Sequence, residues 1–116
     1  MKKKPDTVRI VIPIKPISAN VAWSGRRFKS KTYKQFESDV SKLLPFCKNT
    51  IKGEVEVSYV FHIKNYKMTD VDNCIKQIQD LIVKRGYIED DRKIVKFTAQ
   101  KAQSYVETIL IEIKTI

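Results

Sequence analysis

The segment from residue 54 to residue 64 constrains the fold most, because its apolar side chains recur at every second position. These residues run from Val55 to Ile63 and are separated mostly by polar ones. A period of two is typical of a β-strand with one face in the core and the other in water. Residues 7–14 show the same period before Pro13 and Pro16 interrupt it, so we expect a first strand there.

Two other segments repeat their apolar residues at helical spacing. The first begins near Thr32 and Gln35, which resemble a capping box, and ends at Pro45. The second can be capped by Thr69 or Asp70, and Gly86 stops it. The apolar stripes comprise Tyr33, Phe36, Val40, Leu43 and Leu44 in the first helix, and Val71, Cys74, Ile75, Ile78, Leu81 and Ile82 in the second. Cys74 is therefore expected to be a packed thiol.

Residues 93–101 and 105–114 are typical of two further strands, and their short connection most simply predicts a hairpin. The order β-α-β-α-β-β predicts an α+β fold, in which two helices pack on a mixed or antiparallel sheet. We expect a single domain over residues 1–116, with residues 1–4 forming a disordered basic tail.

The charge of the chain indicates its partners. Lys and Arg number 23 against 13 Asp and Glu, a formal net charge of +10, which favours nucleic acid first and an acidic membrane surface second. No apolar run approaches the ~20 residues of a membrane helix, so we expect a soluble, cytoplasmic protein without a membrane partner. One histidine, two cysteines and three scattered glycines exclude a Cys/His zinc site and a phosphate-cradling loop, so no nucleotide cofactor is expected.

Residues 16–34 interleave aromatic and cationic side chains, among them Trp23, Arg26 and Arg27. Such a loop can neutralise phosphates and stack on bases. A solvated loop whose Trp23 anchors in the core explains the same pattern, and the residues alone leave both readings open.

The acidic residues cluster around the second helix. Asp70 and Asp72 open it and Glu89, Asp90 and Asp91 follow it. Adjacent carboxylates repel unless a cation lies between them, and hard ions such as Mg²⁺ or Mn²⁺ prefer oxygen ligands.

Helical periodicity directs Asp72 and Lys76 away from the core, and a lysine beside such an ion suits a phosphodiester substrate. The plainer alternative is that Asp70 caps the helix, Asp72 complements its dipole, and Lys76 pairs with Asp72 or Asp80. A solvated turn explains the run from Glu89 to Asp91 equally well.

One combined pattern goes beyond these alternatives. The chain reads Asp70-x-Asp72-Asn73-x-x-Lys76-x-x-x-Asp80, then Gly86 and Asp90-Asp91-x-x-Ile94, with Pro16-x-Ser18-x-Asn20 upstream. This combination resembles the RusA family of Holliday junction resolvases of bacteria and their phages, over nearly the whole chain. Ile17, where many relatives have a second proline, and a less basic loop over residues 65–69 depart from the family pattern.

The resemblance implies a homodimeric, Mg²⁺- or Mn²⁺-dependent endodeoxyribonuclease of DNA recombination and repair, which nicks two strands of a four-way junction symmetrically. It implies that Asp70, Asp72 and Asp91 are the essential carboxylates and Lys76 the essential lysine, with Asp90 a candidate further metal ligand. The predicted DNA-binding residues are Asn20, Arg26, Arg27, Lys29, Lys31, Lys67 and Lys101.

Two other functions compete with a resolvase: a non-catalytic nucleic-acid-binding module, and a nuclease acting on any branched or flap DNA. Carboxylates at the ends of one helix repel phosphate, which favours a metal-dependent nuclease over a pure binder. Paired nicks require two sites and therefore two chains. An unpaired sheet edge, or the apolar strand with Ile109, Ile111 and Ile113, is the candidate dimer interface.

Overall fold

The sheet is built around β4 (Val55–Ile63), the strand with the clearest alternating pattern. In this computed structural model, which describes residues 7–18, 23–24 and 28–116, every second side chain of β4 is between 0% and 3% exposed. β6 (Thr108–Thr115) pairs antiparallel with one side of β4, and β5 (Ile94–Gln103) pairs parallel with the other. β1 (Thr7–Ile12) pairs antiparallel with β6, giving a mixed sheet of order β1-β6-β4-β5.

The predicted hairpin of the last two strands is wrong, because β5 and β6 lie on opposite sides of β4. The connection crosses the end of β4, where the amide of Ser104 donates a 3.0 Å hydrogen bond to the carbonyl of Ile63. Ile109, Ile111 and Ile113 of the inner strand β6 are at most 2% exposed, whereas most residues of the edge strand β5 are exposed. The strand order depends on pairings between segments distant in sequence, which no local pattern reveals. The burial of these isoleucines within one chain also contradicts the proposal that the apolar residues of β6 form a dimer interface.

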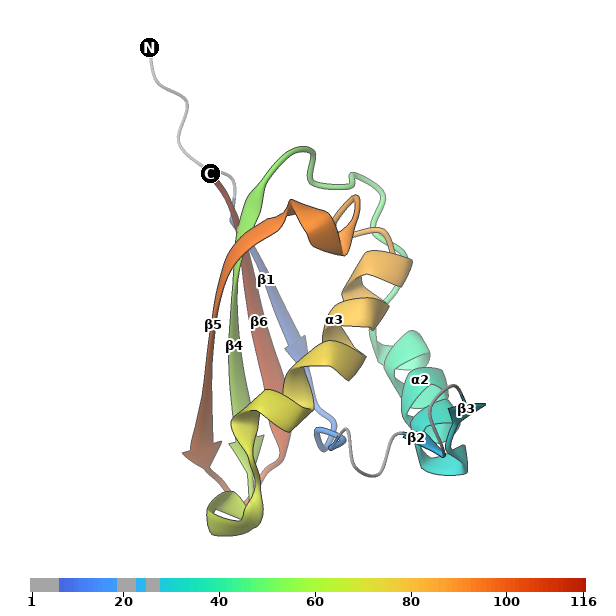
Figure 1. Cartoon of the computed structure of the whole chain (residues 1–116), viewed down its shortest axis with the longest axis vertical. Coiled ribbons are helices and arrows are strands. Elements are labelled where there is room, and N and C mark those ends of the chain that lie inside the picture. The colour runs from blue at the N-terminus through green and yellow to red at the C-terminus, as the bar shows by residue number, and fades with distance from the viewer. Residues whose placement is uncertain (1–6, 19–22, 25–27) are drawn as a thin grey trace.

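Two helices cover one face of this sheet, as the sequence predicted (Figure 1): α2 (Lys31–Leu43) and α3 (Ile75–Lys84). Phe36 and Val40 of α2 and Ile78 and Ile82 of α3 belong to one core cluster with the inward side chains of the strands. The α+β class and the order of the two helices and four sheet strands are confirmed.

The start of α2 differs from the expected capping box. Ser30 is the N-cap, and its hydroxyl accepts a 3.1 Å hydrogen bond from the amide of Tyr33. Gln35 instead donates to the Asp39 carboxylate at 2.9 Å. A serine two residues earlier caps the first turn instead, so the helix begins one residue before Thr32.

The basic segment before α2 contains two short strands that the sequence did not predict, β2 (Trp23–Ser24) and β3 (Phe28–Lys29), which pair antiparallel. The remainder of this segment, residues 19–22 and 25–27, lies outside the described residues, as does the predicted tail.

The end of α3 follows the sequence prediction closely. Gly86 adopts a φ of +83°, and the amides of Gly86 and Tyr87 donate to the carbonyls of Val83 and Ile82, both at 3.0 Å. This is a Schellman motif, which requires the left-handed conformation that glycine adopts at low cost. Within the described part of the chain, no helix is long and apolar enough to cross a membrane.

Candidate active site

The acidic residues at the start of the second helix follow an irregular approach from β4. The chain passes through two 3₁₀ turns, η1 (Tyr66–Met68) and η2 (Val71–Cys74), before α3 begins. Asp70 occupies the N-cap position of η2, but its carboxylate caps no backbone amide, and the Thr69 hydroxyl donates to the Asn65 carbonyl at 2.8 Å. Neither Thr69 nor Asp70 therefore caps the helix with its side chain, and the Asp70 carboxylate makes no capping hydrogen bond.

Asp70 and Asp72 are both exposed, and neither carboxylate has an ion pair or a side-chain hydrogen bond to any residue that the structure describes. Both lie near the Cys74 thiol, whose pKa is raised to about 11, first by burial and then by the charges of Asp72 and Asp70. Cys74 itself is 3% exposed, which confirms the prediction of a packed thiol. The start of α3 therefore carries two carboxylates whose charge no described cation neutralises.

Lys76 is the second residue of α3 and lies on its exposed side. Its ammonium is 3.4 Å from the Asp80 carboxylate, the second of the two pairings that the sequence allowed. The lysine side chain is 68% exposed, and such i,i+4 pairs are worth only ~0.3–0.5 kcal/mol. A phosphate group could therefore displace Asp80 at little cost.

Lys101 of β5 holds the loop that leads to Asp70. Its ammonium donates hydrogen bonds to the carbonyls of Tyr66 at 2.6 Å and Thr69 at 2.9 Å, and lies 4.4 Å from the centre of the Tyr66 ring. Two of its three donors are thereby satisfied within the chain. This predicted DNA-binding residue thus fixes the backbone directly before Asp70.

Gln77 is a second residue that links segments around the site by hydrogen bonds, and the sequence analysis did not predict this role. It is 1% exposed, and its amide donates to the carbonyls of Ile17 at 2.8 Å and Asn73 at 2.6 Å. The segment after β1 is thereby joined to η2. The available signal was a polar side chain next to the buried stripe of α3, where a glutamine needs partners.

The second acidic group lies around η3 (Asp91–Lys93), directly before β5. Asp90 caps this turn: its carboxylate accepts from the Arg92 amide at 3.0 Å and from the Arg92 guanidinium at 3.3 Å. These bonds, led by the one from the Arg92 amide and joined by one to Asp91, lower the pKa of Asp90 to about 2. Asp90 is therefore engaged within its own turn, whereas Asp91 is exposed.

One chain does not bring Asp91 to the other two aspartates. Asp91 precedes the first residue of β5, while Lys101, which contacts the loop before Asp70, lies near the end of that strand. The seven residue-to-residue steps from Ile94 to Lys101 span roughly 23 Å at the rise of an extended strand. Figure 1 shows the start of α3 and the η3 turn at opposite ends of the sheet. Among the described residues, no three His, Cys, Asp or Glu side chains form a group that could hold a metal ion.

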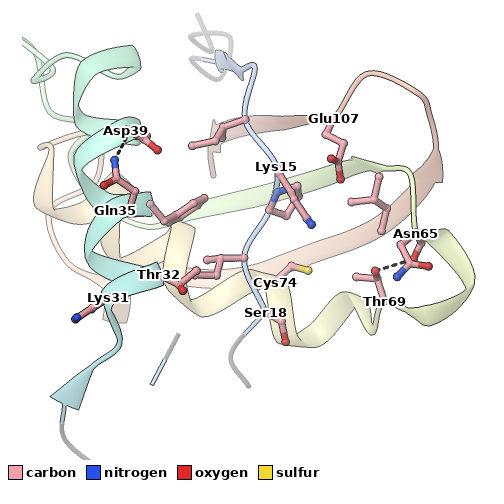
Figure 2. A pocket seen from close by; sticks show the side chains of 15 residues that line it. Lys15, Ser18, Lys31, Thr32, Gln35, Asp39, Asn65, Thr69, Cys74 and Glu107 are labelled. Atoms are coloured by element: carbon pink, nitrogen blue, oxygen red, sulfur yellow. Dashed lines mark hydrogen bonds between the residues drawn. The ribbon is translucent and has the colours of Figure 1, made fainter. Parts of the chain in front are cut away.

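A pocket of about 790 Å³ adjoins the loop before Asp70 (Figure 2). Its walls come from three segments: residues 14–18, the first turns of α2, and residues 63–74 with Glu107. Lys31, a predicted DNA-binding residue, lines it, and Lys67 is exposed on η1. Lys29 lies in β3, and Asn20, Arg26 and Arg27 fall outside the described residues.

The fold and the site define a small, basic α+β domain with exposed carboxylates and a lysine at the start of one helix. The family model for the endodeoxyribonuclease RusA matches residues 13–114, nearly the whole chain. The chain therefore belongs to the RusA family of endodeoxyribonucleases. A search of curated proteins finds no match.

Proposed function

We propose that the protein is a divalent-metal-dependent endodeoxyribonuclease that resolves four-way DNA junctions by paired, symmetric nicks. Membership of the RusA family supports the reaction class. The observation that carries the proposal is the exposed pair of Asp70 and Asp72, held without a neutralising partner among the described residues in a chain of net charge +10. A protein that only binds DNA gains nothing from placing such charges beside its substrate.

The donor set at the start of α3 fits Mg²⁺ or Mn²⁺. Carboxylate oxygens are the ligands that these ions prefer, and Mg²⁺ commonly takes one or two carboxylates together with substrate phosphates and water. Asp70 and Asp72 would hold the ion, which when bound supplies Lewis-acid stabilisation of the phosphate and a more acidic water. The hydrogen bond from the Lys101 ammonium to the Thr69 carbonyl fixes the backbone directly before Asp70.

Lys76 supplies a positive charge near the carboxylates. On leaving Asp80 it can neutralise a non-bridging oxygen of the scissile phosphate, where negative charge develops during hydrolysis. Lys31, which lines the pocket, and Lys67, which is exposed in the loop that leads to Asp70, would contact phosphates of the bound DNA. Thr69, directly before Asp70, lines this pocket, which would give a DNA strand a path to the site.

The position of Asp91 indicates how many chains contribute residues to one active site. If Asp91 acts with Asp70 and Asp72, it must come from a second chain, because its own chain places it at the far end of β5. A two-fold homodimer meets this requirement and the requirement for paired nicks at once, since each chain then contributes to both sites.

The decisive assay compares four-way, three-way, flap and linear DNA of matched sequence, in Mg²⁺ and in EDTA. We expect paired nicks in the four-way junction alone, and only with Mg²⁺. Asp72→Asn serves as the inactive control. Equal cleavage of flaps and four-way junctions would instead identify a general branched-DNA nuclease, and junction binding without cleavage in any divalent ion would identify a binding module.

A further inference from the structure

The pocket beside the loop that leads to Asp70 shares a wall with the candidate active site. Thr69, directly before Asp70, and Cys74, two residues after Asp72, both line it (Figure 2). Its volume of about 790 Å³ lies within the range of roughly 300–1,000 Å³ that is common for small-molecule sites. A group that enters this pocket therefore lies against the segment that carries both exposed carboxylates.

Buried apolar side chains form much of the pocket wall. They come from three segments of the chain and are at most 7% exposed: Ile17, Phe36, Ile63 and Cys74. Such a wall favours a flat, largely apolar group, because the surface of that group is then removed from water. A phosphate cannot enter at low cost, since its charge would lose its hydration. In a chain of net charge +10 from a family of endodeoxyribonucleases, the group of this kind that the bound strand supplies is a nucleobase.

The rim of the pocket carries polar groups that the chain does not use itself. Lys31 lies on one side, Asn65 and Glu107 lie on the other, and Figure 2 shows Lys15 between them. None of these four side chains has an ion pair or a side-chain hydrogen bond to any residue within the described ranges. The two ammonium groups attract the phosphates that flank a base, whereas the carboxylate of Glu107 repels them and needs another partner.

The carboxylate of Glu107 favours some bases over others. It accepts hydrogen bonds and donates none, so it suits the exocyclic amino group of cytosine, adenine or guanine. Thymine has no such group, and two carbonyl oxygens flank its one ring N–H and repel a carboxylate. The Asn65 amide both donates and accepts, so it can pair with any base. The rim therefore favours an amino-bearing base over thymine.

We propose that this pocket takes one unpaired nucleobase of the DNA strand next to the cleaved phosphate, and that Glu107 selects a base with an exocyclic amino group. This inference rests on the proposed function and names what the site reads besides the branched shape. Removing a base from an intact duplex is costly, and least so where pairing is already lost. A branch point interrupts stacking and pairing, so the pocket links cleavage to branched DNA and to the base beside the cut.

Four-way junctions that differ only in the base pair on one side or the other of the cut test this pocket. We expect single-turnover cleavage in Mg²⁺ to be roughly tenfold to a hundredfold slower with thymine than with an amino-bearing base, as for the loss of one hydrogen bond to a charged group. Glu107→Gln should remove most of this difference, because an amide can also donate to thymine. Glu54→Gln, an exposed glutamate outside the pocket, is the matched control and should keep the wild-type preference.

A second readout detects the base itself. In an Asp72→Asn background, 2-aminopurine beside the cut should become brighter on binding, because its fluorescence rises when it leaves the stack. Thr32→Trp fills the mouth of the pocket from the first turn of α2 and should abolish this increase. Ser38→Trp, exposed on the same helix outside the pocket, should not. Circular dichroism confirms that each variant is folded.

The outcomes separate this pocket from the proposed function. Either equal cleavage with all four bases, which needs no variant, or an unchanged fluorescence increase in Thr32→Trp overturns the nucleobase site while leaving the resolvase function intact. A wild-type protein that cuts no four-way junction in any divalent ion would contradict the proposed function, and this inference with it.

Discussion

The ammonium of Lys101 donates a 2.9 Å hydrogen bond to the carbonyl of Thr69, the residue directly before Asp70. A basic residue on an exposed strand is usually read as a phosphate contact in a protein of this charge. Here the same ammonium also donates a hydrogen bond to the Tyr66 carbonyl and makes a cation–π contact with the Tyr66 ring. It therefore connects the sheet to the backbone that positions a proposed metal ligand.

We predict that Lys101→Gln lowers the single-turnover cleavage rate roughly tenfold to a hundredfold, because small displacements of a reacting group have effects of that size. Junction affinity and its dependence on salt should change little. Lys67→Gln is the matched control, since Lys67 is exposed and free to contact DNA, and should reduce the log-log salt slope by about one. The opposite pattern, a reduced slope for Lys101→Gln with an intact rate, would make Lys101 a phosphate contact.

The exposed carboxylates should act in catalysis and oppose binding. Asp70→Asn and Asp72→Asn are expected to abolish cleavage while preserving or improving junction affinity, because each removes a charge that repels phosphate. Asp80→Asn is the control on the same helix: it frees Lys76 from a weak surface pair and should change stability by less than ~0.5 kcal/mol. Near-wild-type nicking by Asp72→Asn in Mg²⁺ would show that the site is wrongly assigned.

Lys76 should affect the reaction more than the binding. Lys76→Ala is expected to reduce the single-turnover rate at saturating protein far more than it reduces affinity, as for a charge used mainly in the transition state. Weaker binding with an unchanged single-turnover rate would assign Lys76 to phosphate contact alone.

Asp90 and Asp91 are neighbours with different expected roles. Asp90→Ser retains a side chain that can cap η3, so we expect cleavage to persist, whereas Asp91→Asn should abolish it. The pKa of Asp90, lowered to about 2, is below that of a free carboxyl, so its stabilising effect is complete above about pH 4 and is lost as the pH falls through 2. Asp90 should therefore contribute nothing to the pH profile of cleavage near neutrality. Loss of cleavage in Asp90→Ser with the fold intact would show that Asp90 is itself part of the site.

Local sequence patterns predicted much of this fold, whereas contacts between distant segments determine the features that they did not predict. The alternation in β4 and the stop at Gly86 depend on residues close in sequence, and both agree with the structure. The place of β5 depends on its parallel pairing with the distant strand β4, and the role of Lys101 depends on a loop more than thirty residues away. No spacing rule contains such information. The acidic pattern identified the family, whereas the separation of Asp91 from Asp70 required the sheet topology.

Mixing two inactive variants tests the central claim most directly. Asp70→Asn and Asp91→Asn chains are each expected to be inactive alone, but a dimer containing one of each has one site with Asp70 and Asp91 both intact if these residues come from different chains. Random reassortment of the two chains by co-refolding should then restore about a quarter of the wild-type sites, each cutting one strand of a junction. If both residues of a site came from one chain, every mixed dimer would carry two defective sites. A mixture as inactive as its parents, with mixed dimers confirmed by mass, would contradict a site shared between subunits.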